Sequence, residues 1–326
     1  MKIIISGGLG YIGGRLSKYF AEQGHTVIAL SRKAAFLPVV DWPANLQVLH
    51  PSDLISDSRK LKGFDVFIHL AALNENDCAK YPAKAIEVNI TETLQWLDNS
   101  WKAGVTKFIY FSTAHVYAKP LTGYFDEQTL TKPIHPYAIT HKCAEDYVLA
   151  YATEKGMENL AIRLTNAFGG PAFPTADRWT LLVNDLCRMA VAEGKMTLLS
   201  DGLQMRDFIC LEDVCAATAH LIGGSTIDKE LLYNMSSGKS VTILDMALLI
   251  NKNAEEFLGR PIDLLRKMPS ENLKTVSHQI SNKRLLSTGF IFNNRIDTEI
   301  KSTLKYFSEN RVQHTNEVVH SKRLHG

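Results

Sequence analysis

Glycines at positions 7, 10 and 13 lie near the start of the chain, shortly after the apolar run 1–5. Glycine allows a backbone to turn tightly and to approach a diphosphate closely, and it lets a new helix pack against the preceding strand. The free N–H groups and the dipole at the start of that helix favour phosphate. The segment therefore predicts a dinucleotide-binding turn; the alternative is a glycine turn that binds no nucleotide. The residues expected at the cofactor are Gly7, Gly10, Tyr11, Ile12 and Gly13.

A second group of polar residues, Ser31, Arg32 and Lys33, comes directly after the apolar run 26–30. Proteins that prefer NAD place an acidic residue at this point, where it binds the ribose hydroxyls. No carboxylate is present here, and a 2′-phosphate would meet a small hydroxyl donor, a planar guanidinium and a point charge. The sequence favours NADP as the cofactor. The alternative is a solvated basic turn, which leaves NAD as the cofactor.

These residues require a sheet whose strands all end at one edge. Short runs rich in branched residues predict parallel strands, and the spacing of apolar residues predicts helices between them. Strand and helix alternate through the first half, which predicts a doubly wound parallel α/β sheet of the Rossmann type with right-handed crossovers. The expected strands are 1–5, 26–30, 46–50, 65–70, 107–111 and 160–164. The expected helices of this half are one that begins after the glycine turn, one between 82 and 104, and one over 137–153.

One of these helices has a specific predicted face. Apolar residues recur every three or four positions between 82 and 104, which places them on one side of a helix that should face the core. They are Ile86, Ile90, Leu94, Leu97 and Trp101.

The regular alternation of strands and helices ends in the second half. Shorter helices, expected over 181–192 and 243–258, are separated there by irregular segments. We predict a Rossmann domain over 1–168, with a return segment near 206–222. A smaller substrate-binding α/β domain occupies 169–326. Its end, 308–326, is polar without apolar periodicity and is expected to be a loosely ordered tail.

The composition excludes several classes of protein. The chain has 326 residues, of which 45% are hydrophobic and 21% charged, and a net charge of +2. These values indicate a globular protein and give no sign of binding to nucleic acid or to a membrane. Five cysteines without metal-ligand spacing predict neither metal nor disulfide, and a strand directly after Met1 leaves no room for a signal peptide. We expect a cytoplasmic protein.

Six ordered segments together resemble the extended short-chain dehydrogenases/reductases that act on nucleotide sugars. The resemblance covers the chain from Lys2 to about Phe307. The segments are 6–13, 69–72 with Asn89, 111–117, 136–138, 163–171 and 202–209.

The resemblance implies two catalytic hydroxyls. Thr113, at the end of the fifth strand, matches the residue that binds the reacting sugar oxygen. Tyr137 matches the tyrosine that gives or takes the proton while a hydride moves between nicotinamide and sugar carbon. Taken alone, the first could be a hydroxyl that closes a strand and the second a packing residue.

The position four residues after Tyr137 departs from the family pattern. The family has a lysine there, whose charge would lower the pKa of a tyrosine about 4 Å away by about two to three units. This chain has His141, and Lys142 is rotated by about 100° around the helix, away from Tyr137. Three outcomes are open: His141 is a weaker or pH-tuned replacement, Tyr137 acts chiefly as an acid, or catalysis is lost. We favour the second, because reduction of a ketone needs only a proton donor.

The resemblance also implies further site residues. Asp53 and Leu54 match a pair on the adenine side of the cofactor, although Asp53 could instead cap the following helix. Asn166 and Arg206 match residues that hold the diphosphate of a nucleotide sugar, although Arg206 could instead form an ion pair with Asp207. Ala71 and Asn89 complete the expected cofactor site.

The two residues after Thr113 narrow the reaction. The dehydratases of the family have Asp-Glu at that point, whereas this chain has Ala114 and His115, which disfavours a 4,6-dehydratase. His115 has no assigned chemical role, and we interpret it as a residue of the wall of the active site. We predict an NADP-dependent reductase of a 4-keto nucleoside-diphosphate sugar. The alternatives are a 4-epimerase with bound NAD, or a cofactor-binding protein with impaired catalysis. Relatives pair through the helices that contain Asn89 and Tyr137, so we expect a homodimer.

Overall fold

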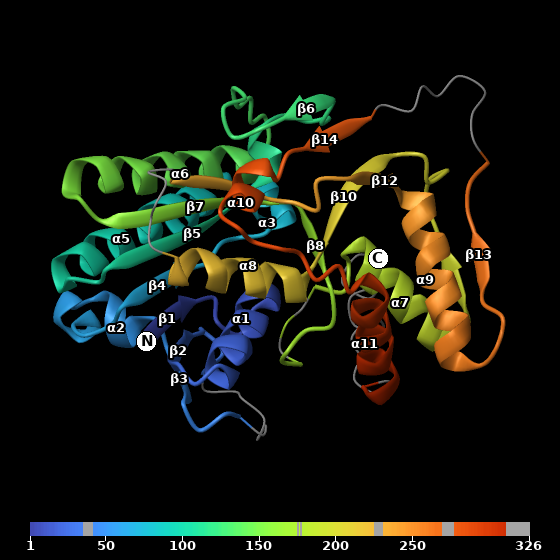
Figure 1. Ribbon diagram of the computed structural model, residues 1–326, viewed down its shortest axis with the longest axis horizontal. Coiled ribbons are helices and arrows are strands. Elements are labelled where there is room, and N and C mark those ends of the chain that lie inside the picture. Colours follow the sequence, from blue (N-terminus) through green and yellow to red (C-terminus); the bar gives the residue numbers. More distant parts are fainter. Residues whose placement is uncertain (35–41, 175, 177, 225–230, 269–276, 311–326) are drawn as a thin grey trace.

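The computed structural model describes residues 1–34, 42–174, 176, 178–224, 231–268 and 277–310. Figure 1 shows a central sheet with helices on both faces and, beside it, a smaller group of helices and short strands. The predicted tail lies outside the described residues from 311 onward, while 308 and 309 belong to the last helix.

The elements occur in this order along the chain. The first part consists of β1 Lys2–Ser6, α1 Tyr11–Glu22, β2 Thr26–Leu30, β3 Leu46–Leu49, α2 Ser52–Ile55, η2 Ser58–Leu61, β4 Val66–His69, α3 Glu75–Lys80, α4 Pro82–Ile86, η3 Glu87–Thr91, α5 Glu92–Ala103, β5 Lys107–Thr113, η4 Ala114–Val116, β6 Gly123–Phe125, α6 Pro136–Lys155 and β7 Glu158–Leu164. The second part consists of β8 Asn166–Phe168, α7 Leu182–Glu193, β9 Lys195–Thr197, β10 Met205–Cys210, α8 Leu211–Gly223, β11 Leu232–Met235, β12 Ser240–Thr242, α9 Ile243–Leu258, β13 Asp263–Leu265, β14 His278–Ile280, α10 Lys283–Ser287 and α11 Ile296–Glu309.

The central sheet has seven parallel strands in the order β11-β7-β5-β4-β1-β2-β3. This order reverses beside β1, so the sheet is doubly wound, as predicted, and has a Rossmann-like fold. Each of the six predicted strands is present with bounds that differ by at most two residues. The seventh strand, β11, was not predicted, because its four residues lie among polar segments and carry no recognisable pattern.

Two apolar layers hold helices against the two faces of this sheet. On one face, Leu16 and Phe20 of α1 pack with Val214 and Leu221 of α8. On the other face, α5 and α6 contribute a second cluster, which includes Trp96 and Val148. After β10, the chain packs on the sheet as α8 and pairs with β7 as β11.

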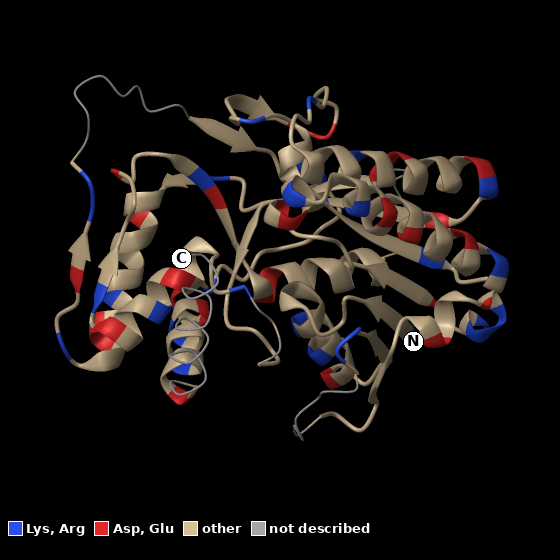
Figure 2. Cartoon of the chain, turned by 180° about the vertical axis from the view of Figure 1, so that it is seen from behind, with Lys and Arg blue, Asp and Glu red and all other residues tan. Residues whose placement is uncertain are grey.

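The smaller part has a core of its own. Residues of α7, α9 and α11 pack around the sheet β12-β10-β8 and around β9, which pairs with β13. Lys and Arg are interspersed with Asp and Glu over the described helices in Figure 2, and no extended region of one sign is visible in that view. The five cysteines are free, and no helix among the described residues is long and apolar enough to cross a membrane.

The predicted face of the helix between 82 and 104 is wrong in part. Ile86 and Trp101 are 54% and 40% exposed, whereas Val88, Trp96 and Leu97 are buried. The reason is a π turn, η3, which separates α4 from α5. Its wider turn changes the direction in which later side chains point, and a constant period of 3.6 residues cannot follow that change.

Candidate active site

The glycine turn lies at the carboxyl end of β1 and leads into α1. Gly7 has φ +67°, a conformation that other residues adopt at a cost. A Cβ on Gly13 would lie 2.2 Å from the carbonyl oxygen of Gly7, and one on Gly7 would lie 3.1 Å from the nitrogen of Ala71. The turn is therefore closed against α1 and against the end of β4, and the first N–H groups of α1 are left without helical partners. This cradle fits the diphosphate of a dinucleotide.

The side chain of Tyr11 points away from that cradle. Its buried hydroxyl donates to the carbonyl oxygen of Gly169 at 2.8 Å and to Oδ1 of Asn184 at 3.2 Å. Burial raises the pKa of this hydroxyl. The side chain thus joins the glycine turn to α7, and only the backbone amides of Tyr11 and Ile12 are placed to meet a phosphate.

The basic residues after β2 are exposed at the same edge of the sheet. The hydroxyl of Ser31 accepts a hydrogen bond from the backbone N–H of Lys33 at 3.1 Å, which shapes the turn. Arg32 is exposed and lies near Glu92 of α5, whose pKa burial raises while Arg32 acts in the opposite direction. The carboxylate of Asp53 accepts from the backbone N–H of His50 at 3.1 Å, and Leu54 is buried. Asp53 lies inside α2, whose first turn has no side-chain cap, so its carboxylate closes the turn before the helix and the cap considered for it is not formed.

Thr113 and Tyr137 meet where β5 ends and α6 begins. Their side chains hydrogen-bond each other. Tyr137 is the second residue of α6, and its backbone N–H donates to Nδ1 of His135, which caps the helix at 3.2 Å. Burial raises the pKa of Tyr137, while Arg178 and the hydrogen bond from Thr113 lower it. The net result is a tyrosine that keeps its proton at neutral pH.

His141 lies one turn along α6, beneath Tyr137. The two ring centroids are 4.3 Å apart, and Nδ1 of His141 is 2.8 Å from the hydroxyl of Tyr110. The side chain is buried, and burial lowers its pKa to about 4, so the imidazole is neutral near pH 7. Its Nε2 is buried without a hydrogen-bond partner within the described part of the chain. Such an atom requires a partner, and a ribose hydroxyl of a bound cofactor would supply one.

Lys142 does not replace the missing cation. Its amine pairs with Asp146, one turn further along α6, and lies 3.8 Å from Glu145. This placement on another side of the helix is the one that helical geometry predicts.

Asn89 lies inside the π turn and supports the site from behind. Its Oδ1 accepts from the backbone N–H of Leu73 at 2.8 Å, and its Nδ2 donates to the hydroxyl of Thr140 at 2.9 Å. These bonds tie the π turn, the segment after β4 and α6 together. Asn89 therefore positions other residues, and the structure does not bring its amide to an open surface, since the side chain is buried.

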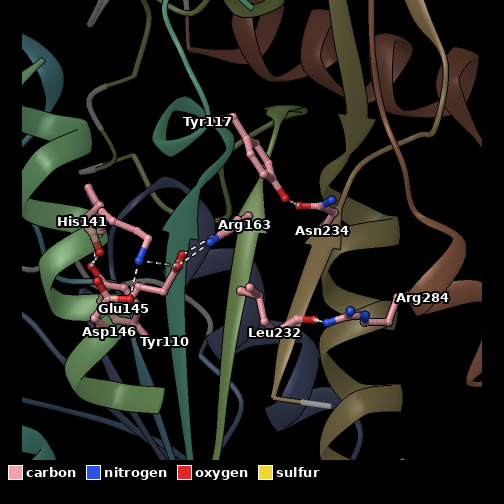
Figure 3. Close-up of polar contacts among 10 residues, drawn as sticks. Tyr110, Tyr117, His141, Glu145, Asp146, Arg163, Leu232, Asn234 and Arg284 are labelled. Carbon is pink, nitrogen blue, oxygen red and sulfur yellow. Dashed lines mark hydrogen bonds and ion pairs between the residues drawn. The ribbon is translucent and has the colours of Figure 1, made fainter. Parts of the chain in front are cut away.

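A buried ion pair connects α6 to β7. Both guanidinium nitrogens of Arg163 on one edge donate to Glu145, at 3.0 and 2.6 Å, and the guanidinium lies 4.7 Å from the ring centroid of Tyr117. The hydroxyl of Tyr117 donates to Oδ1 of Asn234 at 2.7 Å. Figure 3 shows these contacts crossing from α6 through the sheet to β11, with His141 and Tyr110 beside them. This frame fixes α6, and sequence analysis missed it because its members lie far apart in the chain.

On the substrate side, Arg206 and Asn166 lie at the ends of β10 and β8, which pair with each other. The amide of Asn166 donates to the backbone oxygen of Asp207 at 2.8 Å. The carboxylate of Asp207 accepts from Thr165 and Ser237, so the ion pair considered for Arg206 is not formed. No carboxylate of the described residues pairs with Arg206.

A small pocket opens beside Tyr137. Its other lining residues are Glu75, His115, Lys119, Ile134, His135 and Ala138. His115 was expected as part of the wall of the site, whereas Glu75, Lys119 and His135 were not expected there. A signal existed only for His135, whose position directly before a proline at the start of a helix is typical of a cap.

Comparison with known proteins identifies the family of the chain. Residues 3–235 match the model of the NAD dependent epimerase/dehydratase family. A UDP-glucose 4-epimerase of Corynebacterium glutamicum is 23% identical over 273 residues, covering 80% of this chain and 82% of the relative. A dTDP-D-glucose 4,6-dehydratase of Mus musculus is 22% identical over 331 residues, covering 95% and 89%.

Solved structures share the fold. A UDP-glucose 4-epimerase of Thermotoga maritima, solved with UDP-glucose, superposes with a TM-score of 0.77 at 24% identity and covers 95% of this chain and 99% of its own. A UDP-glucuronic acid 4-epimerase of Bacillus cereus, solved with NAD, has a TM-score of 0.77 at 20% identity, covering 95% and 97%.

Proposed function

Because the chain belongs to the NAD dependent epimerase/dehydratase family, we propose that it transfers a hydride to or from a nucleoside-diphosphate sugar, and that its net reaction is reduction of a 4-keto sugar. One observation carries the choice of direction: His141 is buried, neutral and bonded to Tyr110, at the position where the family resemblance implies a lysine. Without that cation Tyr137 keeps its proton, and a protonated tyrosine is the form that a reduction needs.

The residues of the chain divide the work of this reaction. The hydroxyls of Thr113 and Tyr137 bind the ketone oxygen, and Tyr137 donates its proton to that oxygen as negative charge develops there. Nε2 of His141 binds a ribose hydroxyl and so orients the cofactor. The bound dinucleotide supplies the hydride. Arg178 lies near enough to Tyr137 to stabilise the tyrosinate left after proton transfer.

NADP is the proposed cofactor. The turn after β2 has an exposed guanidinium at Arg32 and no carboxylate, and a 2′-phosphate fits that pair of properties. The diphosphate of the sugar nucleotide is assigned to Arg206, which lacks an ion-pair partner among the described residues, and to Asn166.

A 4-epimerase with bound NAD is the second candidate. The relatives of Corynebacterium glutamicum and Thermotoga maritima carry that name. An epimerase must oxidise as well as reduce at the same carbon, so it needs Tyr137 as a base in one half of its cycle. The neutral His141 argues against Tyr137 acting as a base. The same observation is the reason for a third candidate, a protein that binds the cofactor without turnover.

We also propose a homodimer formed by α4, α5 and α6. Ile86 and Trp101 are exposed on the first two helices, and Ile139 and Tyr147 are 47% and 44% exposed on the third. α4 and α5 each pack against α6, so these side chains belong to neighbouring helices. Burial of such a set against a second copy removes apolar surface from water.

The test is a panel of 4-keto and ordinary nucleotide sugars, each incubated with NADPH or NADH, with absorbance at 340 nm and product followed together. We expect consumption of NADPH with a 4-keto sugar and preferential binding of NADPH over NADH, with the preference lost in Arg32→Ala. Equal affinity for the two cofactors contradicts the phosphate site. Interconversion of ordinary sugars without added cofactor contradicts the reductase in favour of the epimerase.

The role of His141 is tested separately. His141→Ala should retain measurable reduction, because neutral Tyr137 donates its proton without help. If His141→Ala loses reduction while its cofactor affinity is unchanged, neutral Tyr137 does not donate its proton without help. If turnover is seen only in His141→Lys, the protein is the third candidate, which binds cofactor without catalysis.

A further inference from the structure

The first two turns of α1 direct side chains to the smaller part of the molecule. Tyr11 and Arg15 are four residues apart, so both lie on one face of the helix. The hydroxyl of Tyr11 bonds the carbonyl oxygen of Gly169, in the loop after β8, and Oδ1 of Asn184 on α7. The guanidinium of Arg15 donates to the carbonyl oxygen of Gly170 at 2.9 Å. The helix whose amides form the phosphate cradle is therefore bonded to the part expected to bind the substrate.

A buried ion pair reinforces these bonds. Both terminal nitrogens of Arg15 donate to the carboxylate of Glu299 on α11, at 2.5 and 3.1 Å. The Glu299 side chain is 3% exposed and also accepts from the backbone N–H of Glu212 at 3.2 Å, in the first turn of α8. A buried carboxylate needs a cation and hydrogen-bond donors, and this one has both. We call Tyr11, Arg15, Asn184 and Glu299 the α1 clamp.

The loop after β8 is enclosed by the α1 clamp. Gly169 has φ +146°, and a Cβ there would lie 2.2 Å from Oε1 of Glu299. A Cβ on Gly14 of α1 would lie 2.9 Å from the ring of Phe173, so the same loop also packs on the helix. Both contacts are close because glycine has no side chain. A shift of α1 or of α11 would therefore displace this loop.

The same loop leads to the residues assigned to the substrate. It begins three residues after Asn166, the first residue of β8, which pairs with the strand that carries Arg206. Asn184 extends the connection, because its Nδ2 donates to the carbonyl oxygen of Arg178, whose side chain lies near Tyr137. The α1 clamp thus joins the turn expected at the cofactor to the residues expected at the sugar nucleotide and beside the catalytic tyrosine.

We propose that Arg15 is a positioning residue that couples the two sites: through the α1 clamp, binding of the dinucleotide strengthens binding of the sugar nucleotide, and the reverse. This rests on the proposed function, which supplies the two ligands. A phosphate held by the first turn of α1 fixes Tyr11 and Arg15, and with them the loop that follows Asn166. The second ligand then meets a site that is already ordered, so its binding costs less conformational entropy. Coupling of binding free energies is reciprocal, so the factor is the same for either order of binding.

Isothermal titration calorimetry measures this coupling. The full-length protein is titrated with UDP-glucose and with dTDP-glucose, first alone and then at saturating NADPH or NADH, whichever it binds more tightly. Neither sugar has a ketone, so the reduced cofactor cannot transfer a hydride to it and the complex persists. We expect wild type to bind the preferred sugar nucleotide about 5-fold or more tightly when the cofactor is bound.

Glu299→Gln keeps the size of the side chain and removes its charge, so Arg15 loses its ionic partner. The ratio of affinities should fall below about 2-fold, while each ligand alone binds within about 2-fold of wild type, because Glu299 touches neither ligand site. A residue that only stabilised the fold would lower the free energy of unfolding and leave the ratio as it is.

Glu256→Gln is the matched control. Glu256 pairs with Lys301 of α11 at 2.8 Å, but this exposed pair joins α9 and α11 within the smaller part, so the coupling should keep its wild-type value. Urea unfolding establishes that each variant is folded. If Glu299→Gln is not, the double substitution of Arg15→Gln with Glu299→Gln replaces it, because that variant leaves no buried charge unpaired.

Two results would overturn the proposal: a wild type that binds both ligands without coupling, or a folded clamp variant that keeps the coupling of wild type. Equal loss of coupling in Glu256→Gln also contradicts it, since the effect would then not depend on the α1 clamp. A wild type that fails to bind one of the ligands contradicts the proposed function, and the coupling with it. Coupling in a protein that does not oxidise NADPH supports the α1 clamp and contradicts only the reductase.

Discussion

At the scale of single residues, the chemistry of this protein depends on which groups are charged. His141 and His69 are both buried histidines with depressed pKa values, about 4 and about 3, and burial is the main cause for each. His69 bonds Ser6 at 2.6 Å and Thr93 at 2.9 Å. Neither ring can supply a positive charge to the site near neutral pH, and for this reason Tyr137 is proposed to act as a proton donor.

These two histidines predict a loss of stability in mild acid. Below pH 6.5 the unfolded chain takes up a proton at each, while the folded protein does not until the pH approaches 4 or 3. The free energy of unfolding therefore falls with pH in that window, by about 2 kcal/mol per histidine between pH 7 and 5. Urea unfolding of wild type and His141→Gln at both pH values measures it: the variant should lose about 2 kcal/mol less, and an equal loss would contradict the buried neutral state.

At the scale of elements, two short segments set the geometry of the site. The glycine turn between β1 and α1 brings backbone amides to one point, and the π turn η3 places Asn89 against the segment after β4 and against α6. Both depend on backbone conformation more than on side-chain chemistry.

Gly13→Ala tests the first of these segments. The new Cβ would lie 2.2 Å from the carbonyl oxygen of Gly7, so the turn must open. We expect a loss of about 1–3 kcal/mol in unfolding free energy and loss of dinucleotide binding, measured by urea unfolding and by fluorescence titration with NADPH. Gly223→Ala is the control, because nothing lies within 4 Å of its added Cβ. Unchanged affinity in Gly13→Ala would show that the cofactor does not depend on this turn.

At the scale of the whole molecule, the pattern of exposed apolar residues gains a meaning. Ile86 and Trp101 were predicted to face the core, yet they are exposed in the single chain. In the proposed dimer they would be buried between copies. The apolar residues at these positions would then be explained by burial between two copies of the chain and not by burial in the core of one copy.

Ile86→Glu and Tyr147→Glu should each shift the protein from dimer to monomer, because each would place an unpaired charge within that interface. Size-exclusion chromatography with light scattering gives the mass at micromolar concentration. Leu248→Glu, on α9, is the control, since Leu248 is 52% exposed but lies outside the three helices. A monomeric wild type, or a dimer that survives both substitutions, would contradict the proposed interface.

The sequence by itself determined the sheet and the positions at its edge, because those features arise from local patterns. Runs of branched residues predict strands wherever they occur, and the glycine spacing predicts a turn that a Cβ would obstruct. The position of Lys142 could be derived from helical geometry alone. Asp53 was left between two interpretations, and in the structure its carboxylate accepts from the backbone N–H of His50 and does not cap α2.

Tertiary structure decided the features that depend on distant neighbours. The pKa of His141 depends on its burial beside Tyr110, and the frame of Glu145, Arg163 and Tyr117 joins three elements. Whether the imidazole of His115 has a hydrogen-bond partner depends on elements other than its own segment, and none of the described residues supplies one. Burial, ion pairing and the shape of a pocket are sums over residues far apart in the chain, and no local pattern records them.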